Sequence, residues 1–523
     1  MRKLLFNSLA AVLLLFVSLG FAQNSQLNQP QTPSPAAPAQ SQPTATPVPS
    51  TTPEQSQSPT PQAKPQATPN PNRVEIEPVG PEEKEHKISP AEAKELFQSV
   101  DEILSFASQD TGLPIKKKVK RAIIGREQVE KYVGEKFEND ADRIRFERSE
   151  LVQKKFGLLP RDFDLHSFLI KLLKEQVAGF YDEKTKTMNL LDWNSPDMQR
   201  PVMAHELTHA LQDQSFDLEK MTKHDEDIEK KGLKDLDELV RNDEESTCRS
   251  AVMEGQAMIV LIDYVLAPSD ESVQKMPKVV DMMQASMDKS KDSPVFDSAP
   301  LLLQEELAFP YRQGMKFIRD LLVAGGKQLA YKGVLERMPQ TTREIMEPQE
   351  YLAGRRVPPL LLPNLDFLKK DYEPFDAGAV GELDVNILLR VYADKTVADR
   401  LSPEWRGGAY YAAGHKGAKP SDKNSTAHVG LLYVSKWAND AAAKDFATFY
   451  AAALPKRYQS LQKVSADTAT DGRYEFKSSD GPIFIQQTGN MVMAVESFDE
   501  EAAKRLLQTE AKQTASSDTG GSN

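Results

Sequence analysis

The segment Pro201–Asp213 constrains the fold of this chain more than any other, because it requires a helix with two different faces. At about 100° per residue, His205 and His209 lie about 40° apart, close enough to bind one metal ion. Glu206 lies beside them, where its carboxylate can reach a water molecule on that ion. The opposite arc is apolar and is expected to pack on the core; it carries Met203, Ala204, Leu207, Ala210 and Leu211.

The residues before this helix indicate two short strands. Phe180 and Tyr181 precede a polar turn at 182–184, and a second strand is predicted over Thr187–Leu191. A loop then leads to the helix, which is expected to contain Pro201 in its first turn, where proline is favoured.

A third metal ligand is required downstream, because a catalytic zinc ion takes three protein ligands and keeps one position for water. Glu254 is the candidate, since it lies in a helix predicted over 244–265, on a face of small or apolar neighbours. A buried carboxylate needs a partner, and an ion held by the two histidines would provide it. A buried Arg or Lys is the alternative partner, and Asp243 and Glu244 are lesser ligand candidates. Gln256 is predicted on the opposite, solvent-facing side.

The N-terminal residues 1–22 have the features of a secretory signal peptide. Arg2 and Lys3 precede the apolar stretch Leu9–Leu19, and small residues flank the cleavage position in Gly20–Ala22. The apolar stretch is shorter than the roughly 20 residues of a membrane-spanning helix, so cleavage is favoured over an uncleaved anchor. We find no other segment long and apolar enough to span a membrane. The sequence therefore predicts a secreted or periplasmic protein without stable membrane insertion.

A proline-rich segment follows the leader. It holds 15 of the 35 prolines between Gln23 and Pro81, and no aromatic residue occurs between Gln23 and Leu96. Such a segment cannot bury enough apolar area to offset its chain entropy, so we expect a solvated tether. The predicted organisation is a signal peptide at 1–22, a disordered linker at 23–84, a mainly helical domain with a small sheet at 85–395, an α+β subdomain at 400–510 and a disordered tail at 511–523.

Composition excludes several classes of function and site. The formal charge of −12 argues against a nucleic-acid-binding surface, which normally shows a basic footprint. The single cysteine, Cys248, excludes an intramolecular disulfide and a multi-thiolate zinc site. In the C-terminal part, strands are predicted at Ala409–Ala413, His428–Ser435 and Pro482–Val495, and helices at Asn439–Ala453 and Asp499–Leu507. The overall fold class predicted is α+β.

These motifs resemble the gluzincin group of zinc metallopeptidases, and most closely secreted bacterial members that carry two characteristic segments. His205–Gln214 reads HELTHALQDQ, and Arg249–Ala257 has the pattern Arg-x-Ala-x-x-Glu-Gly-x-Ala. The likeness extends over about residues 170–390. It implies a zincin-like catalytic domain with one Zn²⁺ per chain on His205, His209 and Glu254, and with Glu206 as the general base.

The sequence departs from the better-known gluzincins at one position. Those enzymes place an aspartate four residues after the ligand glutamate, where this chain has Met258. Carboxylates beyond the ligands orient metal-bound imidazoles. Asp213, four residues after His209 and on the same helix face, is a candidate substitute, and an ordinary surface aspartate is the alternative.

The resemblance also implies how a substrate would be held. In zincins, the strand before the motif helix pairs with an extended peptide, and here that strand would be Thr187–Leu191. A donor for the oxyanion of the tetrahedral intermediate is expected as well. Tyr311 is the preferred donor; the other candidates are Tyr181, His415 and His428.

The sequence favours a secreted zinc metallopeptidase that acts on peptide or protein substrates. One alternative is a catalytically silent, zinc-bound scaffold that binds a partner in the cell envelope. Another is a latent enzyme whose cleft is covered by residues 88–115. The presence of Glu206 favours an enzyme, because a scaffold has no chemical need for a base beside the metal.

Overall fold

A computed structural model describes residues 87–137, 140–176, 179–287, 293–418, 425–464, 472–509 and 512–513. The predicted signal peptide at 1–22 and linker at 23–84 lie outside these residues. All of the described residues belong to one compact unit.

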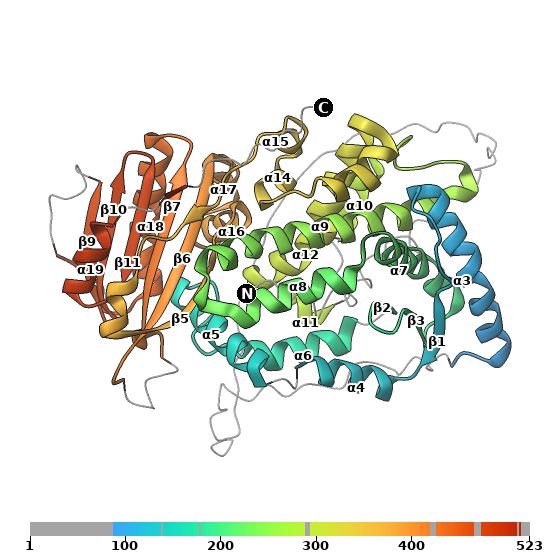
Figure 1. Ribbon diagram of the computed structural model, residues 1–523, viewed down its shortest axis with the longest axis horizontal. Coiled ribbons are helices and arrows are strands. Elements are labelled where there is room, and N and C mark those ends of the chain that lie inside the picture. Colours follow the sequence, from blue (N-terminus) through green and yellow to red (C-terminus); the bar gives the residue numbers. More distant parts are fainter. Residues whose placement is uncertain are drawn as a thin grey trace, which may run out of the picture. The chain divides into compact units, whose positions relative to one another are not determined.

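The first part of the unit is mainly helical, with three short strands among the helices (Figure 1). Its elements are α3 (Pro90–Thr111), β1 (Lys120–Ile124), α4 (Arg126–Phe137), α5 (Asp140–Phe156), α6 (Leu165–Gln176), β2 (Phe180–Asp182), β3 (Thr187–Leu191), α7 (Pro196–Phe216), α8 (Leu218–Lys231), α9 (Leu236–Leu266), α10 (Val279–Met287), α11 (Pro294–Asp297), α12 (Leu301–Lys327), the π-helix η4 (Gln328–Gly333), α13 (Val334–Glu336), α14 (Thr342–Met346) and α15 (Pro348–Leu352).

The second part is built on a larger sheet with helices beside it (Figure 1). Its elements are β4 (Leu360–Leu361), β5 (Tyr372–Ala379), α16 (Glu382–Tyr392), α17 (Lys395–Leu401), β6 (Trp405–His415), β7 (Val429–Trp437), α18 (Asp440–Arg457), β8 (Gln462–Lys463), β9 (Arg473–Ser478), β10 (Gly481–Thr488), β11 (Met491–Glu496), α19 (Glu500–Leu507) and β12 (Lys512–Gln513).

The large sheet has seven antiparallel strands in the order β5-β6-β7-β11-β10-β9-β8. The predicted mixed α+β class is confirmed. The strand predicted over Pro482–Val495 is two strands, because Gly489, with φ 55°, turns the chain between β10 and β11. The sheet also includes β5, which precedes the boundary predicted near residue 400. Within the segment predicted as a disordered tail, Lys512 and Gln513 pair with β4.

The helix α9 runs through the core of the helical part and packs on α7 and α12. Residues Leu236–Ser269 are long and apolar enough to cross a membrane by composition alone, contrary to the sequence expectation. Most of that apolar window is buried inside the structure, and the buried surface includes both apolar side chains and Glu254.

The crossing of α9 and α12 depends on two glycines in direct backbone contact. A Cβ atom on Gly314 would lie 2.1 Å from the carbonyl oxygen of Ala251, and one on Gly255 would lie 2.4 Å from the Gly314 carbonyl group. No side chain fits at either position, because such separations are far inside van der Waals contact. Since Gly255 follows Glu254, the close approach of the two helices at this crossing also fixes where the backbone of Glu254 lies.

We expect Gly314→Ala to lower the free energy of unfolding by about 3 kcal/mol or more, because the new methyl group must push two helix backbones apart. Urea-induced unfolding would measure the change. Gln313→Ala, one residue away and only half-buried, is the matched control and should shift stability by about 0.5 kcal/mol or less. Equal stability of Gly314→Ala and the parent protein would contradict this packing.

Residues 88–115 contribute α3, which belongs to the core. Ser89 caps the helix by accepting a hydrogen bond from the Glu92 amide, and the Glu92 carboxylate accepts one from the Ser89 amide. One face packs on α7 and α9 and buries Leu96, Val100, Ile103, Leu104 and Ala107. The structure therefore does not support residues 88–115 as a removable cover over a cleft.

Deletion of residues 23–115 is expected to unfold the protein rather than activate it. Each of the larger α3 side chains contributes roughly 1.5–3 kcal/mol by burial, and the loss of several of them approaches the roughly 5–15 kcal/mol that stabilises a whole domain. Thermal unfolding and solubility would measure the effect, and deletion of 23–84 alone is the control. A stable truncated protein with raised activity would restore the latent-enzyme hypothesis.

Candidate functional site

The helix α7 begins at Pro196, earlier than the sequence predicted. Ser195 is the N-cap in an extended conformation, and Pro196 occupies the first helical position, where a missing N–H removes no intrahelical bond. Pro201, predicted in the first turn, lies inside the helix. The predicted apolar arc is confirmed, since Met203, Ala204, Leu207, Ala210 and Leu211 are fully buried.

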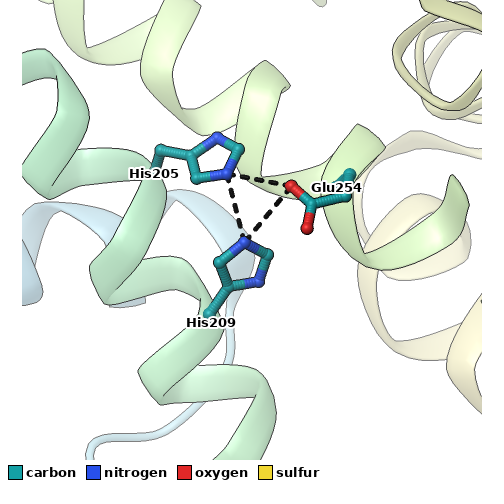
Figure 2. A group of neighbouring side chains, drawn as sticks. All are labelled: His205, His209 and Glu254. Carbon is teal, nitrogen blue, oxygen red and sulfur yellow. Dashed lines mark hydrogen bonds and ion pairs between the residues drawn. The ribbon is translucent and has the colours of Figure 1, made fainter. Parts of the chain in front are cut away.

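Three side chains from two helices meet at one point (Figure 2). His205 and His209 extend from α7 toward Glu254 of α9, and Glu254 Oε2 lies 3.0 Å from His205 Nε2 and 3.4 Å from His209 Nε2. The two Nε2 atoms are 3.1 Å apart. Among the described residues, the ion-pair partners of Glu254 are thus histidines, and not the buried Arg or Lys considered as an alternative.

The spacing of this cluster suits a tetrahedral metal ion. Two ligand atoms that are each about 2.0–2.1 Å from a tetrahedral ion lie about 3.3 Å from one another. The three pairwise distances between the donor atoms of His205, His209 and Glu254 are all close to that value. His205 and Glu254 are buried, whereas the His209 side chain is 13% exposed and marks the side open to solvent.

Burial and neighbouring charges shift the pKa values of all three cluster residues. Burial opposes charge on His209, but the Glu254 carboxylate outweighs it and raises the pKa of His209 to about 9. Burial likewise opposes charge on Glu254, and His209 outweighs it and lowers the pKa of that carboxyl to about 2. Burial lowers the pKa of His205.

Glu206 has one carboxylate oxygen bound and one without a partner. Oε2 accepts a hydrogen bond of 2.7 Å from the Tyr181 backbone amide. Oε1 is buried and has no hydrogen-bond partner in the described part of the chain. Burial raises the pKa of Glu206 to about 8. A carboxylate in this condition is a suitable proton acceptor near neutral pH.

The strand beside Glu206 is β2, and the expectation that an extended peptide pairs with Thr187–Leu191 is wrong, because both sides of that strand are already paired. The small sheet has the order β1-β3-β2, so Thr187–Leu191 is the central strand. Its second partner, β1, comes from residues 120–124 and pairs with it in parallel. Because the Tyr181 amide is directed at Glu206, the outer side of β2 faces the site.

Of the four oxyanion-donor candidates, the structure brings two to the site. Tyr311, on α12, stacks on His205 with ring centroids 6.3 Å apart. Burial, followed by the charges of Glu254 and Glu206, raises the pKa of Tyr311 well above its usual value, so its hydroxyl keeps its proton. Tyr181 lies beside the site, but its backbone amide donates to Glu206 and its hydroxyl donates to Asp213. His415 ends β6 and His428 precedes β7, both on the large sheet.

The lesser ligand candidates lie elsewhere on α9. Glu244 Oε2 accepts hydrogen bonds from the amide and hydroxyl of Thr342, at 2.8 and 2.9 Å. Asp243 accepts one from the Ala379 amide at 3.1 Å. Both therefore join α9 to its neighbours at α14 and β5.

Asp213 does not orient a histidine, contrary to one of the sequence interpretations. It accepts a hydrogen bond from the Tyr181 hydroxyl at 2.8 Å and pairs with Lys186 at 2.8 Å. The imidazole of His209 instead meets Gln212, with Nδ1 2.8 Å from Oε1. Gln212 and Gln256 are both fully buried, so the solvent-facing position predicted for Gln256 is wrong. The sequence signal that could have found Gln212 is its spacing, three residues after His209 on the same helix.

Comparison with known proteins adds no assignment to this geometry. No protein-family model, curated protein or solved structure matches the chain. The chemistry of the site has to be inferred from its own residues.

Proposed function

We propose that this chain is a secreted zinc metallopeptidase with a zincin-like catalytic domain, and that Glu206 is its general base. The observation that carries the proposal is the buried Oε1 atom of Glu206, which has no hydrogen-bond partner among the described residues and lies beside the cluster of His205, His209 and Glu254. A purely structural cation site needs the cluster, but it has no use for a buried carboxylate with one unbound oxygen. The N-terminal features of the sequence support secretion.

The donor set supports zinc as the metal. Two imidazoles and one carboxylate are a common protein set in catalytic zinc sites, with the fourth position left to water. Other divalent ions also bind such donors, and affinity alone does not separate them. When bound, the ion polarises the scissile carbonyl and makes water a nucleophile near neutral pH.

Residues of the chain would transfer the proton, stabilise the oxyanion and align the peptide. Glu206 accepts the proton of the attacking water and donates it to the leaving amine, while the Tyr181 amide holds its other oxygen in place. The Tyr311 hydroxyl is the preferred candidate donor to the developing oxyanion, since its ring stacks on His205. An extended peptide would align along the outer side of β2, which takes the role expected of Thr187–Leu191.

Cleavage of a mixed peptide library by the purified 23–523 protein tests this function. One sample would be untreated, one treated with a chelator, and one chelated and then supplied with Zn²⁺. We expect cleavage in the first and third samples only, and the cleaved bonds would reveal the side-chain preference. A zinc-loaded, folded protein that cleaves no peptide would instead favour the scaffold that binds an envelope partner.

A further inference from the structure

A chain of buried side-chain amides begins at His209 and leads away from the site. His209 Nδ1 lies 2.8 Å from Gln212 Oε1. The Nε2 group of Gln212 donates to the Met253 carbonyl oxygen at 3.1 Å and to Gln256 Oε1 at 2.8 Å. These contacts cross from α7 to α9, between the two helices that carry the cluster. Both glutamine side chains are fully buried, so water does not compete for their hydrogen bonds.

The chain of amides ends on backbone carbonyl groups of the π-helix η4. Gln256 Nε2 donates to the carbonyl oxygens of Ala330 and Tyr331, at 2.8 and 3.0 Å. A carbonyl oxygen accepts hydrogen bonds and cannot donate them. The end of η4 therefore fixes which atom of the Gln256 amide faces it.

This fixed end determines the direction of every hydrogen bond back to His209. Since the Gln256 NH₂ group faces η4, its Oε1 atom faces Gln212 and must accept. The Gln212 NH₂ group then faces both Gln256 and the Met253 carbonyl, which leaves Gln212 Oε1 directed at His209. An amide oxygen only accepts, so His209 Nδ1 must carry a hydrogen. Its Nε2 atom is the one that faces His205 and Glu254.

We propose that Gln212 and Gln256 are positioning residues that hold His209 in the orientation and tautomer with Nε2 free to bind the metal. This inference rests on the proposed metal site. A hydrogen bond to the second nitrogen of a ligand histidine fixes the ring and raises its basicity. Here the acceptor for His209 Nδ1 is the oxygen of a neutral amide. This relay of the Gln212 and Gln256 amides also connects the His209 ring to η4, a segment about 120 residues away in the sequence.

Cobalt affinity, measured by competition with a chelator, tests the role of Gln212. We expect Gln212→Leu to bind Co²⁺ about 10–100-fold more weakly than the parent protein and to change the visible spectrum of the bound ion. Gln212→Glu keeps an acceptor for Nδ1–H and should recover part of the affinity. Gln256→Met, which removes only the anchor of the relay, should weaken Co²⁺ binding less than Gln212→Leu does.

Gln199→Leu is the matched control, because Gln199 is buried on the same helix and its hydrogen bonds within the described residues go to backbone groups of residues 191 and 194. We expect this variant to lose stability in urea and to keep the parent's Co²⁺ affinity and spectrum. An unchanged affinity in folded Gln212→Leu and Gln256→Met would overturn the proposal. An equal loss of affinity in Gln199→Leu would do so as well.

A measurement on the metal-free protein separates this inference from the proposed function. In a ¹⁵N-histidine-labelled sample, the Nδ1–H signal of His209 should exchange slowly with solvent in the parent and rapidly in Gln212→Leu; a His209→Asn sample assigns the signal. Failure of the parent to bind Co²⁺ would refute the metal site, and the exchange result would still decide whether the relay holds the ring. Rapid exchange in the parent would refute the relay itself.

Discussion

Glu206→Gln is expected to lower the rate of peptide hydrolysis by roughly 10²–10⁴-fold while zinc stays bound. The substituted amide has nearly the same shape, and its oxygen can still accept the hydrogen bond from the Tyr181 amide. It cannot take a proton from water, so only the acid–base step is lost. Turnover of the best library peptide and the zinc content of the purified protein would be measured together.

Glu219→Gln is a suitable control for this comparison. Glu219 is a partly exposed carboxylate on α8 that pairs with Lys186 and Lys223 and is not a member of the cluster. The substitution removes the same charge and should leave turnover within a factor of about two, because surface ion pairs contribute little. A zinc-loaded Glu206→Gln protein as active as this control would rule out Glu206 as the base.

The meeting of α7 and α9 could be predicted from the sequence because helical periodicity is local information. The spacing of His205 and His209 predicted which face of α7 carries the ligands. The small and apolar neighbours of Glu254 predicted which face of α9 packs against another helix. The structure brings these faces together, with the donor atoms of all three residues within 4.8 Å of one another. Their roles as metal ligands stay a prediction.

The features that the sequence did not predict depend on partners far along the chain. Thr187–Leu191 was expected to pair with an extended peptide, but β2 and the parallel strand β1, from residues 120–124, occupy both of its sides. A helical wheel assigned Gln256 to solvent because the wheel contains no information about Gln212 or η4, which cover it. Polarity alone therefore misplaces a residue whenever a buried partner supplies its hydrogen bonds.

The larger sheet shows the same division between local and distant information. Its strands β6 and β7 and the helices α18 and α19 were predicted from the local sequence pattern. The strand β5 was missed, since Glu373, Pro374 and Asp376 interrupt its apolar pattern. It is held in the sheet by pairing with β6, and a bulge between Pro374 and Asp376 accommodates the proline.

Glu254→Gln should remove most of the stabilisation that zinc gives to the folded protein. A ligand that binds only the native state stabilises it by about 2.7 kcal/mol at a concentration 100 times its Kd. The carboxylate is the only anionic member of the cluster of His205, His209 and Glu254, and its loss leaves the ion with two neutral imidazoles in a buried site. The thermal unfolding midpoint of the metal-free protein, measured with and without added Zn²⁺, reports this difference.

Glu244→Gln provides the comparison that separates loss of a ligand from loss of a buried charge. Glu244 is also a buried carboxylate on α9, but its partner is Thr342 rather than a histidine. Both variants are expected to be less stable than the parent without metal, because each weakens the hydrogen bonding of a buried group. Only Glu244→Gln should keep the parent's upward shift in midpoint on addition of Zn²⁺. An undiminished shift in Glu254→Gln would mean that the ion binds without this carboxylate, and the third ligand would have to be sought elsewhere.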